Sequence, residues 1–225
     1  MHCLPLPRHV IWDWNGTLLD DVALCVEVMD GMLRARGLPG LDVQRYREVF
    51  DFPVIEYYRR LGFDFEVEPF SEVGTEFIVT YERRRHEAPL RAGAVEVLHR
   101  LRAAGVTQSL LSAYRQESLE QLIRTHGLET HFLALRGLGD HYAHGKQELG
   151  LRHLAELPYA REEIVLVGDT VHDHEVATLL GLRAFLLTDG HQAASRLATS
   201  GRPLLAELRA LPSVLGLECM MQTTS

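Results

Sequence analysis

The sequence predicts an α/β protein with a Rossmann-like, doubly wound parallel sheet and an all-helical segment inserted after the first strand. The apolar run Val10-Ile11-Trp12 ends abruptly at Asp13, as a buried strand does where it meets a functional loop. After Pro89, helical patterns and apolar runs alternate. Units of this kind form mostly parallel sheets with helices on both faces and right-handed crossovers.

The stretch that follows the first strand is helical in pattern. Apolar residues recur there at three- and four-residue steps, at Val22, Val26, Met29 and Leu33. Two later amphipathic windows cover residues 54–58 and 76–81. We expect residues 20–88 to form a helical cap and residues 1–19 with 89–225 to form the α/β core, since 225 residues suffice for one core and a smaller module.

The remaining elements follow in order. A helix with Val95, Leu98 and Leu101 on one face precedes a strand over 106–111. Helices are then expected around 117–125, 147–156, 174–180 and 203–211, and strands over 132–135, 163–167 and 183–187. In such sheets ligands bind beyond the carboxyl ends of the strands. Asp13, Ser112 and Asp169 each stand at such an end.

Composition excludes several classes of function. A formal charge of -8 disfavours a nucleic-acid partner, which would require a basic face. Cys3, Cys25 and Cys219 are odd in number and lack CxxC spacing, so they indicate neither a disulfide framework nor a zinc site. No run of ~20 apolar residues and no signal-peptide pattern is found, so we expect a cytoplasmic protein without a membrane partner; nothing in the sequence indicates its oligomeric state.

Lys146 is the single lysine among 23 basic residues, the other 22 being arginines. Two interpretations stay open: the site requires a compact ammonium charge that a planar guanidinium cannot replace, or one lysine survives by chance on the surface.

The residues near the predicted sheet edge suit phosphoryl chemistry: Asp13, Thr17, Ser112, Lys146, Asp169 and Asp173. Carboxylates suit a hard cation such as Mg²⁺. A lysine and a hydroxyl suit a phosphoryl group. A carboxylate could then attack the phosphorus and form an aspartyl phosphate that water cleaves.

Four segments together resemble the haloacid dehalogenase-like superfamily. Residues 13–17 (DWNGT) resemble its DxDGT motif, and Ser112, Lys146 and residues 168–173 (GDTVHD, for GDxxxD) follow in the family's order. The helical segment resembles the cap of its phosphoglycolate phosphatase-like members. The resemblance spans nearly the whole chain and implies a Mg²⁺-dependent phosphatase acting on a small phosphorylated metabolite.

The resemblance also assigns roles. Asp13 would be the nucleophile, and Lys146 would neutralise charge on the phosphoryl group and hold Asp13 in place. The Mg²⁺ ligands would be Asp13, the backbone carbonyl of Asn15, Asp169 and Asp173. The substrate contacts would be Ser112, Ala113, Thr17 and Lys146, with Thr17 also fixing the loop.

Asn15 departs from the family pattern, which has an acid/base aspartate there. An amide cannot shuttle a proton near neutral pH, and the loss of a general acid typically costs ~10²–10⁴ in rate. Three explanations stay open. The substrate carries a good leaving group, such as an acyl phosphate; a proton carrier is borrowed from His144, His172 or His174; or the protein is catalytically weak and binds a phosphorylated metabolite as a regulator.

Two site residues have structural alternatives. Asp21, like Asp20, is interpreted as a charge at a helix N-terminus rather than as a catalyst. Ser112 could be an ordinary helix N-cap.

Overall fold

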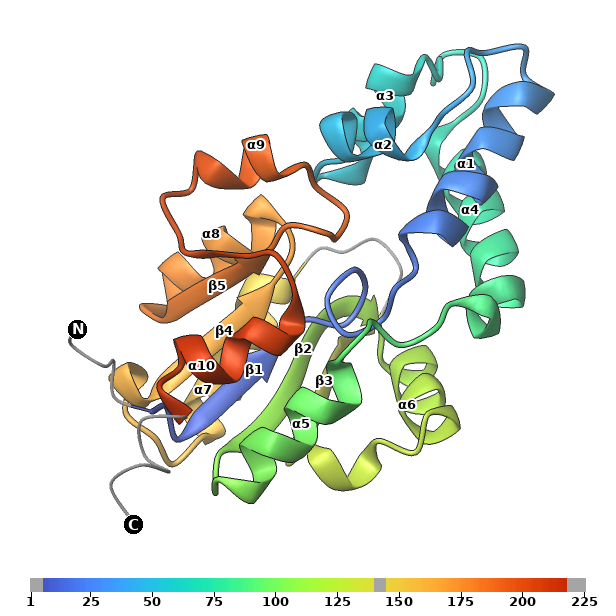
Figure 1. Ribbon diagram of the computed structural model, residues 1–225. Helices are drawn as coiled ribbons and strands as arrows, with labels where there is room; N and C mark the ends of the chain where they lie inside the picture. Colours follow the sequence, from blue (N-terminus) through green and yellow to red (C-terminus); the bar gives the residue numbers. More distant parts are fainter. Residues whose placement is uncertain (1–5, 140–144, 218–225) are drawn as a thin grey trace.

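A six-stranded parallel sheet forms the centre of the protein in the computed structural model, which describes residues 6–139 and 145–217 (Figure 1). The strands are β1 (His9–Trp12), β2 (Thr107–Arg115), β3 (Ala134–Leu138), β4 (Ile164–Gly168), β5 (Arg183–Leu187) and β6 (Leu204–Leu205). Their spatial order is β3-β2-β1-β4-β5-β6, and every neighbouring pair is parallel. The prediction of an α/β, Rossmann-like fold is confirmed.

Helices cover both faces of the sheet. One layer contains α5 (Ala94–Ala103), α6 (Gln116–Thr125), η4 (Leu208–Ala210) and α10 (Leu211–Val214), and the other contains α7 (Lys146–Glu156) and α8 (Val171–Leu180). Shorter elements are η2 (Glu129–His131), η3 (Arg161–Glu163) and α9 (Ala194–Ala198). Successive strand side chains point to opposite faces. Val10 and Trp12 therefore join the first layer's core and Ile11 the second's, which is why all of β1 is buried.

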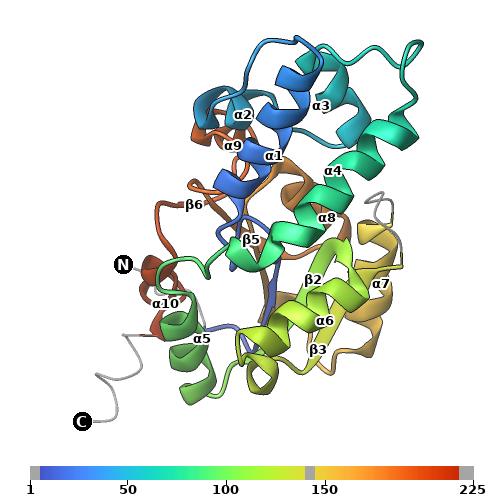
Figure 2. The same cartoon turned by 90° about the vertical axis from the view of Figure 1, so that its right-hand side faces the viewer.

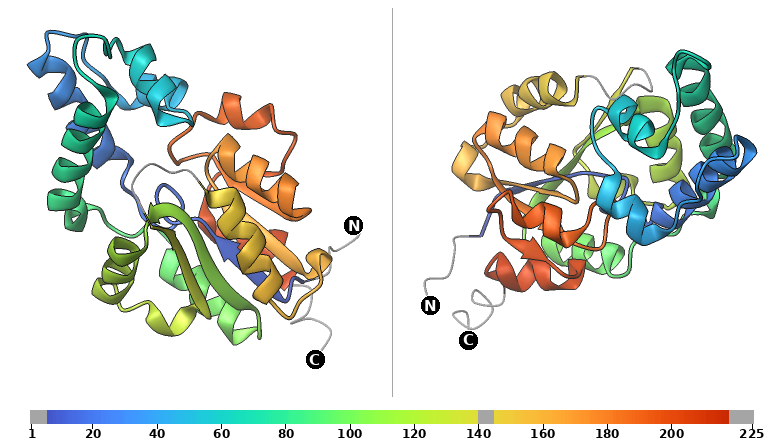
Figure 3. Two further views of the ribbon diagram at one scale, coloured as in Figure 1. Left: turned by 180° about the vertical axis from the view of Figure 1, so that it is seen from behind. Right: turned by 90° about the horizontal axis from the view of Figure 1, so that it is seen from above.

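The helical segment, residues 20–88, stands over the carboxyl ends of the strands (Figures 1 and 3). It consists of α1 (Val22–Ala35), α2 (Val43–Val49), α3 (Val54–Leu61), α4 (Phe70–Arg84) and η1 (Arg85–Glu87). Helices α1 and α4 pack side by side (Figure 2) and bury Met29, Leu33 and Val73. The division of the chain into a core and a separate cap domain stays a prediction.

No helix in residues 6–139 and 145–217 has both the length and the apolar character needed to span a bilayer.

Several expectations about individual elements are wrong. Val95 is 41% exposed, and Val97 takes its place beside Leu98 and Leu101 on the buried face of α5. Strand β2 continues past Ser112 to Arg115, after a shift in its register against β3. Instead of one helix over 203–211, the chain forms the short edge strand β6 and then η4, because Leu204 and Leu205 pair with β5.

Candidate active site

Asp13 and Asp169 lie side by side at the sheet edge because β1 and β4 are neighbouring parallel strands. Asp13 directly follows β1, and its backbone N–H donates to the carbonyl of Val167 at 2.8 Å. Asp169 directly follows β4. Because the carboxyl ends of neighbouring parallel strands meet at one edge of the sheet, two residues more than 150 positions apart in the sequence lie together.

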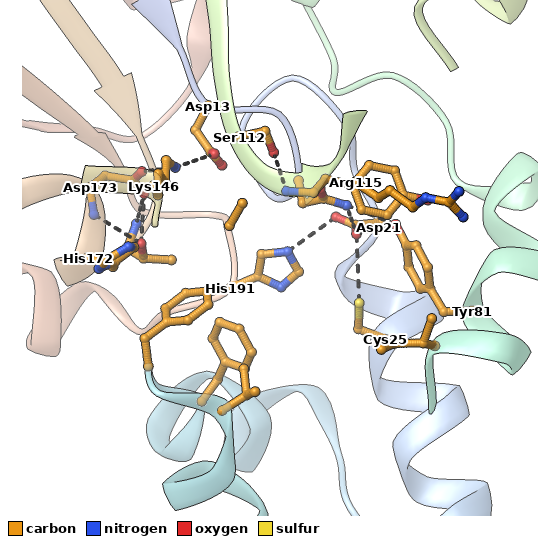
Figure 4. Close-up of a pocket in the computed structure, with 18 of the residues that line it drawn as sticks. Asp13, Asp21, Cys25, Tyr81, Ser112, Arg115, Lys146, His172, Asp173 and His191 are labelled. Atoms are coloured by element: carbon orange, nitrogen blue, oxygen red, sulfur yellow. Dashed lines mark hydrogen bonds and ion pairs between the residues drawn. The ribbon is translucent and has the colours of Figure 1, made fainter. Parts of the chain in front are cut away.

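Lys146 begins α7 and connects two of the carboxylates. Its Nζ donates to Oδ1 of Asp13 at 2.5 Å and to Oδ1 of Asp173 at 2.7 Å (Figure 4). The lysine is 3% exposed. Although burial opposes it, the Asp13 and Asp173 carboxylates raise its pKa further above its ordinary value. The surface interpretation of the single lysine is therefore wrong.

The three acidic side chains form a group that could hold a cation. Oxygens of Asp13, Asp169 and Asp173 all lie within 4.8 Å of one another, and all three residues are buried. Burial, with the two neighbouring carboxylates, raises the pKa of Asp13 to about 8 although Lys146 opposes the shift. One ammonium does not balance three carboxylates, so a divalent cation with a preference for oxygen ligands fits this donor set.

Asp169 and Asp173 are held by further hydrogen bonds. Asp169 accepts from the hydroxyl of Thr17 at 2.8 Å and from the backbone N–H of His191 at 2.7 Å. Oδ2 of Asp173 accepts from both the backbone N–H and the hydroxyl of Thr170 in the capping box of α8. Thr17 is completely buried, and its hydroxyl is directed at Asp169 rather than at the pocket. This hydrogen bond fixes the loop after β1 against Asp169.

Ser112 and Ala113 line the same pocket as Asp13 and Lys146. The Ser112 hydroxyl oxygen accepts from the backbone N–H of Tyr114 at 3.1 Å, and its own hydrogen remains available to a phosphoryl oxygen. The N-cap of α6 is Arg115. The alternative interpretation of Ser112 as a helix N-cap is therefore wrong.

Asn15 is held by two groups that its sequence neighbourhood does not reveal. Its Nδ2 donates to Oδ2 of Asp21 at 2.8 Å and to the hydroxyl of Tyr81 at 2.9 Å. Asp21 does occupy the N-cap position of α1, but its carboxylate makes no capping hydrogen bond. It instead accepts from Asn15, from the backbone N–H of Gly16 and from Tyr81. Asp21 is a residue of the site, contrary to the sequence interpretation.

His191 is a second residue that sequence reasoning missed. Its ring contacts the hydroxyl of Tyr46 through Nδ1 at 2.8 Å and Oδ1 of Asp21 through Nε2 at 3.2 Å. Although burial opposes it, the Asp21 carboxylate raises the pKa of His191 to about 9. The sequence feature that could have identified His191 is its position four residues after β5, at the sheet edge where the carboxyl ends of the other strands lie.

Cys25 completes this second group and is a free, buried cysteine. Its sulfur lies 3.7 Å from Oδ2 of Asp21, and the ligand atoms of Asp21, Cys25 and His191 all lie within 4.8 Å of one another. Burial and the Asp21 charge raise the pKa of the thiol well above its ordinary value. Because a thiolate is the form that binds metals, the group is better described as a hydrogen-bonded cluster.

Two of the three histidines expected as proton carriers lie within the described residues, and they have different surroundings. His172 lines the pocket, with Nδ1 3.3 Å from Glu175 and an Nε2 that has no partner in the part of the chain that the structure describes. His174 accepts a hydrogen bond from Arg202 at 3.0 Å and does not line the pocket. His144 lies outside the described residues.

The outer wall of the pocket is apolar and is contributed by the helical segment. Its members are Phe50, Phe52, Val54 and Ile78, each half-buried. The ring of Phe52 lies 5.5 Å from that of Phe50 and 5.0 Å from that of His172. Arg115 also lines the pocket and forms an ion pair with Glu117.

Residues 10–187 match the haloacid dehalogenase-like hydrolase family, and the chain belongs to it. This confirms the resemblance on which the sequence interpretation depended.

Two curated relatives illustrate the range of this similarity. The chain is 28% identical over 192 residues to the tyrosine-protein kinase PtkA of Mycobacterium tuberculosis, covering 82% of this chain and 63% of that protein. It is 27% identical over 210 residues to a phosphoglycolate phosphatase of Vibrio vulnificus, covering 88% of this chain and 91% of the relative. The chain thus spans less than two thirds of PtkA.

Solved structures agree with the fold. A structure of M. tuberculosis PtkA matches with a TM-score of 0.78 and 25% identity, over 94% of this chain and 99% of that one. A structure described as a predicted phosphoglycolate phosphatase from Haemophilus somnus matches with a TM-score of 0.74 and 16% identity, over 92% of this chain and 97% of that one.

Proposed function

We propose that the protein is a Mg²⁺-dependent phosphatase that hydrolyses a small phosphorylated metabolite through an aspartyl phosphate on Asp13. The observation that carries the proposal is the Lys146 ammonium, which contacts both Asp13 and Asp173 in a buried pocket. Oδ1 of Asp13 is held by this lysine, which leaves Oδ2 for the phosphorus. Family membership and the phosphoglycolate phosphatase relatives support the same chemistry.

The cation would be held by Asp13, the Asn15 backbone carbonyl and Asp169, with Asp173 in support. When bound, it would withdraw charge from the phosphoryl oxygens and allow two anions to approach. Lys146 would hold Asp13 in place and, together with the cation, would favour its ionised form. Ser112 would donate its hydroxyl hydrogen to a phosphoryl oxygen. Asp13 would attack the phosphorus, the leaving oxygen would depart with the bonding pair, and water would later release inorganic phosphate.

The test is phosphate release from acetyl phosphate, p-nitrophenyl phosphate and an alkyl phosphate, with Mg²⁺ and after its removal by a chelator. We expect Asp13→Asn to abolish turnover while the fold persists, as judged by circular dichroism. Asp20→Asn is the matched control, since the Asp20 side chain is 43% exposed and pairs with Arg91. Turnover by Asp13→Asn would remove Asp13 from the nucleophile role, and no turnover by the wild type on any compound would favour a binding protein.

A further inference from the structure

Asp21 takes up the hydrogen-bond donors that surround position 15. This carboxylate is 1% exposed and lines the pocket. Its partners are the Asn15 amide (2.8 Å), the Tyr81 hydroxyl (2.7 Å), the Gly16 backbone N–H (2.9 Å), the His191 ring (3.2 Å) and the Cys25 thiol (3.7 Å). Five donors therefore converge on one carboxylate and are turned away from the substrate.

Asn15 lines the pocket but has no free hydrogen-bond donor for a substrate. Both hydrogens of its Nδ2 are used, on Asp21 and Tyr81. Its Oδ1 has no partner among residues 6–139 and 145–217. The bridging oxygen of a phosphate ester also carries lone pairs, so an acceptor beside it gives the departing oxygen no help.

The neighbouring ring does not supply this missing donor. Both nitrogens of His191 are already engaged, one by Tyr46 and the other by Asp21. Near position 15, the leaving oxygen of a substrate would therefore depart as an anion.

The apolar outer wall limits what that leaving group can be. Phe50, Phe52 and Ile78 present apolar surface to the pocket that also contains Asp13. Aromatic walls of this kind favour a flat apolar body, through burial of surface and through offset or edge-to-face ring contacts. A small, charged leaving group would gain nothing from these apolar side chains, and Arg115 beside them is already paired with Glu117.

We propose that the substrate of this site is an aryl phosphate monoester. This inference depends on the proposed function. The Asp13 carboxylate oxygen forms a bond to phosphorus, and the bond from phosphorus to the aryl oxygen breaks. The bonding pair stays on the aryloxide, which takes a proton from water after it leaves. Because a phenol has a pKa of about 10, far below that of an alkyl alcohol, this departure needs no acid.

His172 provides the opposing hypothesis. Its Nε2 has no partner in the described part of the chain, and its ring lies against Phe52 in the pocket wall. If this ring donated a proton to the leaving group, alkyl and aryl esters would be hydrolysed at similar rates. The two hypotheses therefore predict different dependences on the leaving group.

The experiment measures kcat/KM with Mg²⁺ for phenyl, benzyl, cyclohexyl and acetyl phosphate. Benzyl phosphate keeps the ring but has an alkyl oxygen, cyclohexyl phosphate keeps the size without the ring, and acetyl phosphate has a good leaving group without the ring. We expect kcat/KM for phenyl phosphate to exceed that for benzyl and cyclohexyl phosphate by about 10²-fold or more. It should also exceed kcat/KM for acetyl phosphate, because phenyl phosphate has a lower KM.

Each other outcome overturns something specific. Benzyl or cyclohexyl phosphate within tenfold of phenyl phosphate would show that an acid acts, and would overturn this inference alone. A higher kcat/KM for acetyl phosphate than for phenyl phosphate would also overturn it, because the apolar wall would then not bind the ring of the leaving group. Turnover of none of the four compounds would overturn the proposed function as well.

A matched pair of variants tests the wall. Ile78 lines the pocket, whereas its neighbour Val79 is 50% exposed and does not. Ile78→Ala should lower the ratio of phenyl to acetyl phosphate hydrolysis by about tenfold, since it removes apolar contact with the ring. Val79→Ala should leave both rates unchanged. Equal ratios in the two variants would overturn the assignment of the wall to the leaving group.

Discussion

Asn15 donates its amide to Asp21 across 2.8 Å inside the pocket. Because a carboxylate can only accept, this contact fixes which way the amide faces. The change from aspartate to Asn15 therefore does more than remove a general acid. It also supplies the hydrogen-bond donor that the buried carboxylate of Asp21 needs. An aspartate at position 15 would place two carboxylates in contact, and one of them would have to hold a proton.

The first prediction exchanges this pair. Asn15→Asp alone should lower the free energy of unfolding by roughly 1–3 kcal/mol, because a buried acceptor loses its donor. The double variant Asn15→Asp, Asp21→Asn restores a donor and an acceptor in reversed order. It should recover part of that stability, because the contact between His191 and position 21 loses its charge, and it should gain about 10²-fold in hydrolysis of an alkyl phosphate. Urea unfolding and phosphate release measure both, and an Asn15→Asp protein as stable as the wild type would contradict the argument.

The second prediction concerns the single lysine. Lys146→Arg keeps the positive charge but replaces one point charge, in contact with both Asp13 and Asp173, by a larger planar group in a buried position. A displacement of about 1 Å at the nucleophile can cost on the order of 10²-fold in rate, and we expect a loss of this size in kcat. Arg34→Lys, on an exposed ion pair with Asp30, is the control. Full activity of Lys146→Arg would show that the lone lysine is an accident.

The sequence was sufficient for the parts of the site that follow from strand ends. Asp13 and Asp169 each follow an apolar run, so their meeting at one edge could be predicted without coordinates. Asp21 could not be placed this way, because a carboxylate at a helix N-terminus is usually explained by the helix dipole. Its role depends on Tyr81, sixty residues away. The edge strand β6 was missed for a related reason: two residues carry too little pattern, and only pairing with β5 defines them.

The third prediction concerns pH and a buried chain of hydrogen bonds away from the site. Ser109 Oγ lies 2.7 Å from Nε2 of His9 and 2.7 Å from Nε2 of His153. Burial lowers the pKa of each histidine to about 4, with a further contribution from the other ring at His9 and from Arg136 at His153. Both rings are neutral in the folded state, while in the unfolded chain they take up protons below pH about 6.5.

Stability should therefore be unaffected by these groups above pH about 6.5 and should fall as the pH drops toward 4. Urea unfolding at pH 7 and pH 5 measures the loss. His153→Gln should show a smaller loss than the wild type, and the remainder should come from His9 together with His126 and His131, whose pKa values burial also lowers. His86→Gln, on the surface, is the control. An identical loss in wild type and His153→Gln would contradict the assignment.

The fourth prediction separates backbone strain from crowding at the site. Gly16 has a φ of +73°, and a Cβ there would lie 2.3 Å from Oδ2 of Asp169 and 2.4 Å from Cδ2 of His191. Gly37 has a φ of +67° with nothing within 4 Å of the same position. Gly37→Ala should cost only the left-handed backbone, about 1–2 kcal/mol, and keep its activity. Gly16→Ala should cost more and lose phosphate release, because Asp169 must move. Equal stability and equal rates in the two alanine variants would show that the close approach of Asp169 and His191 to Gly16 is not needed for activity.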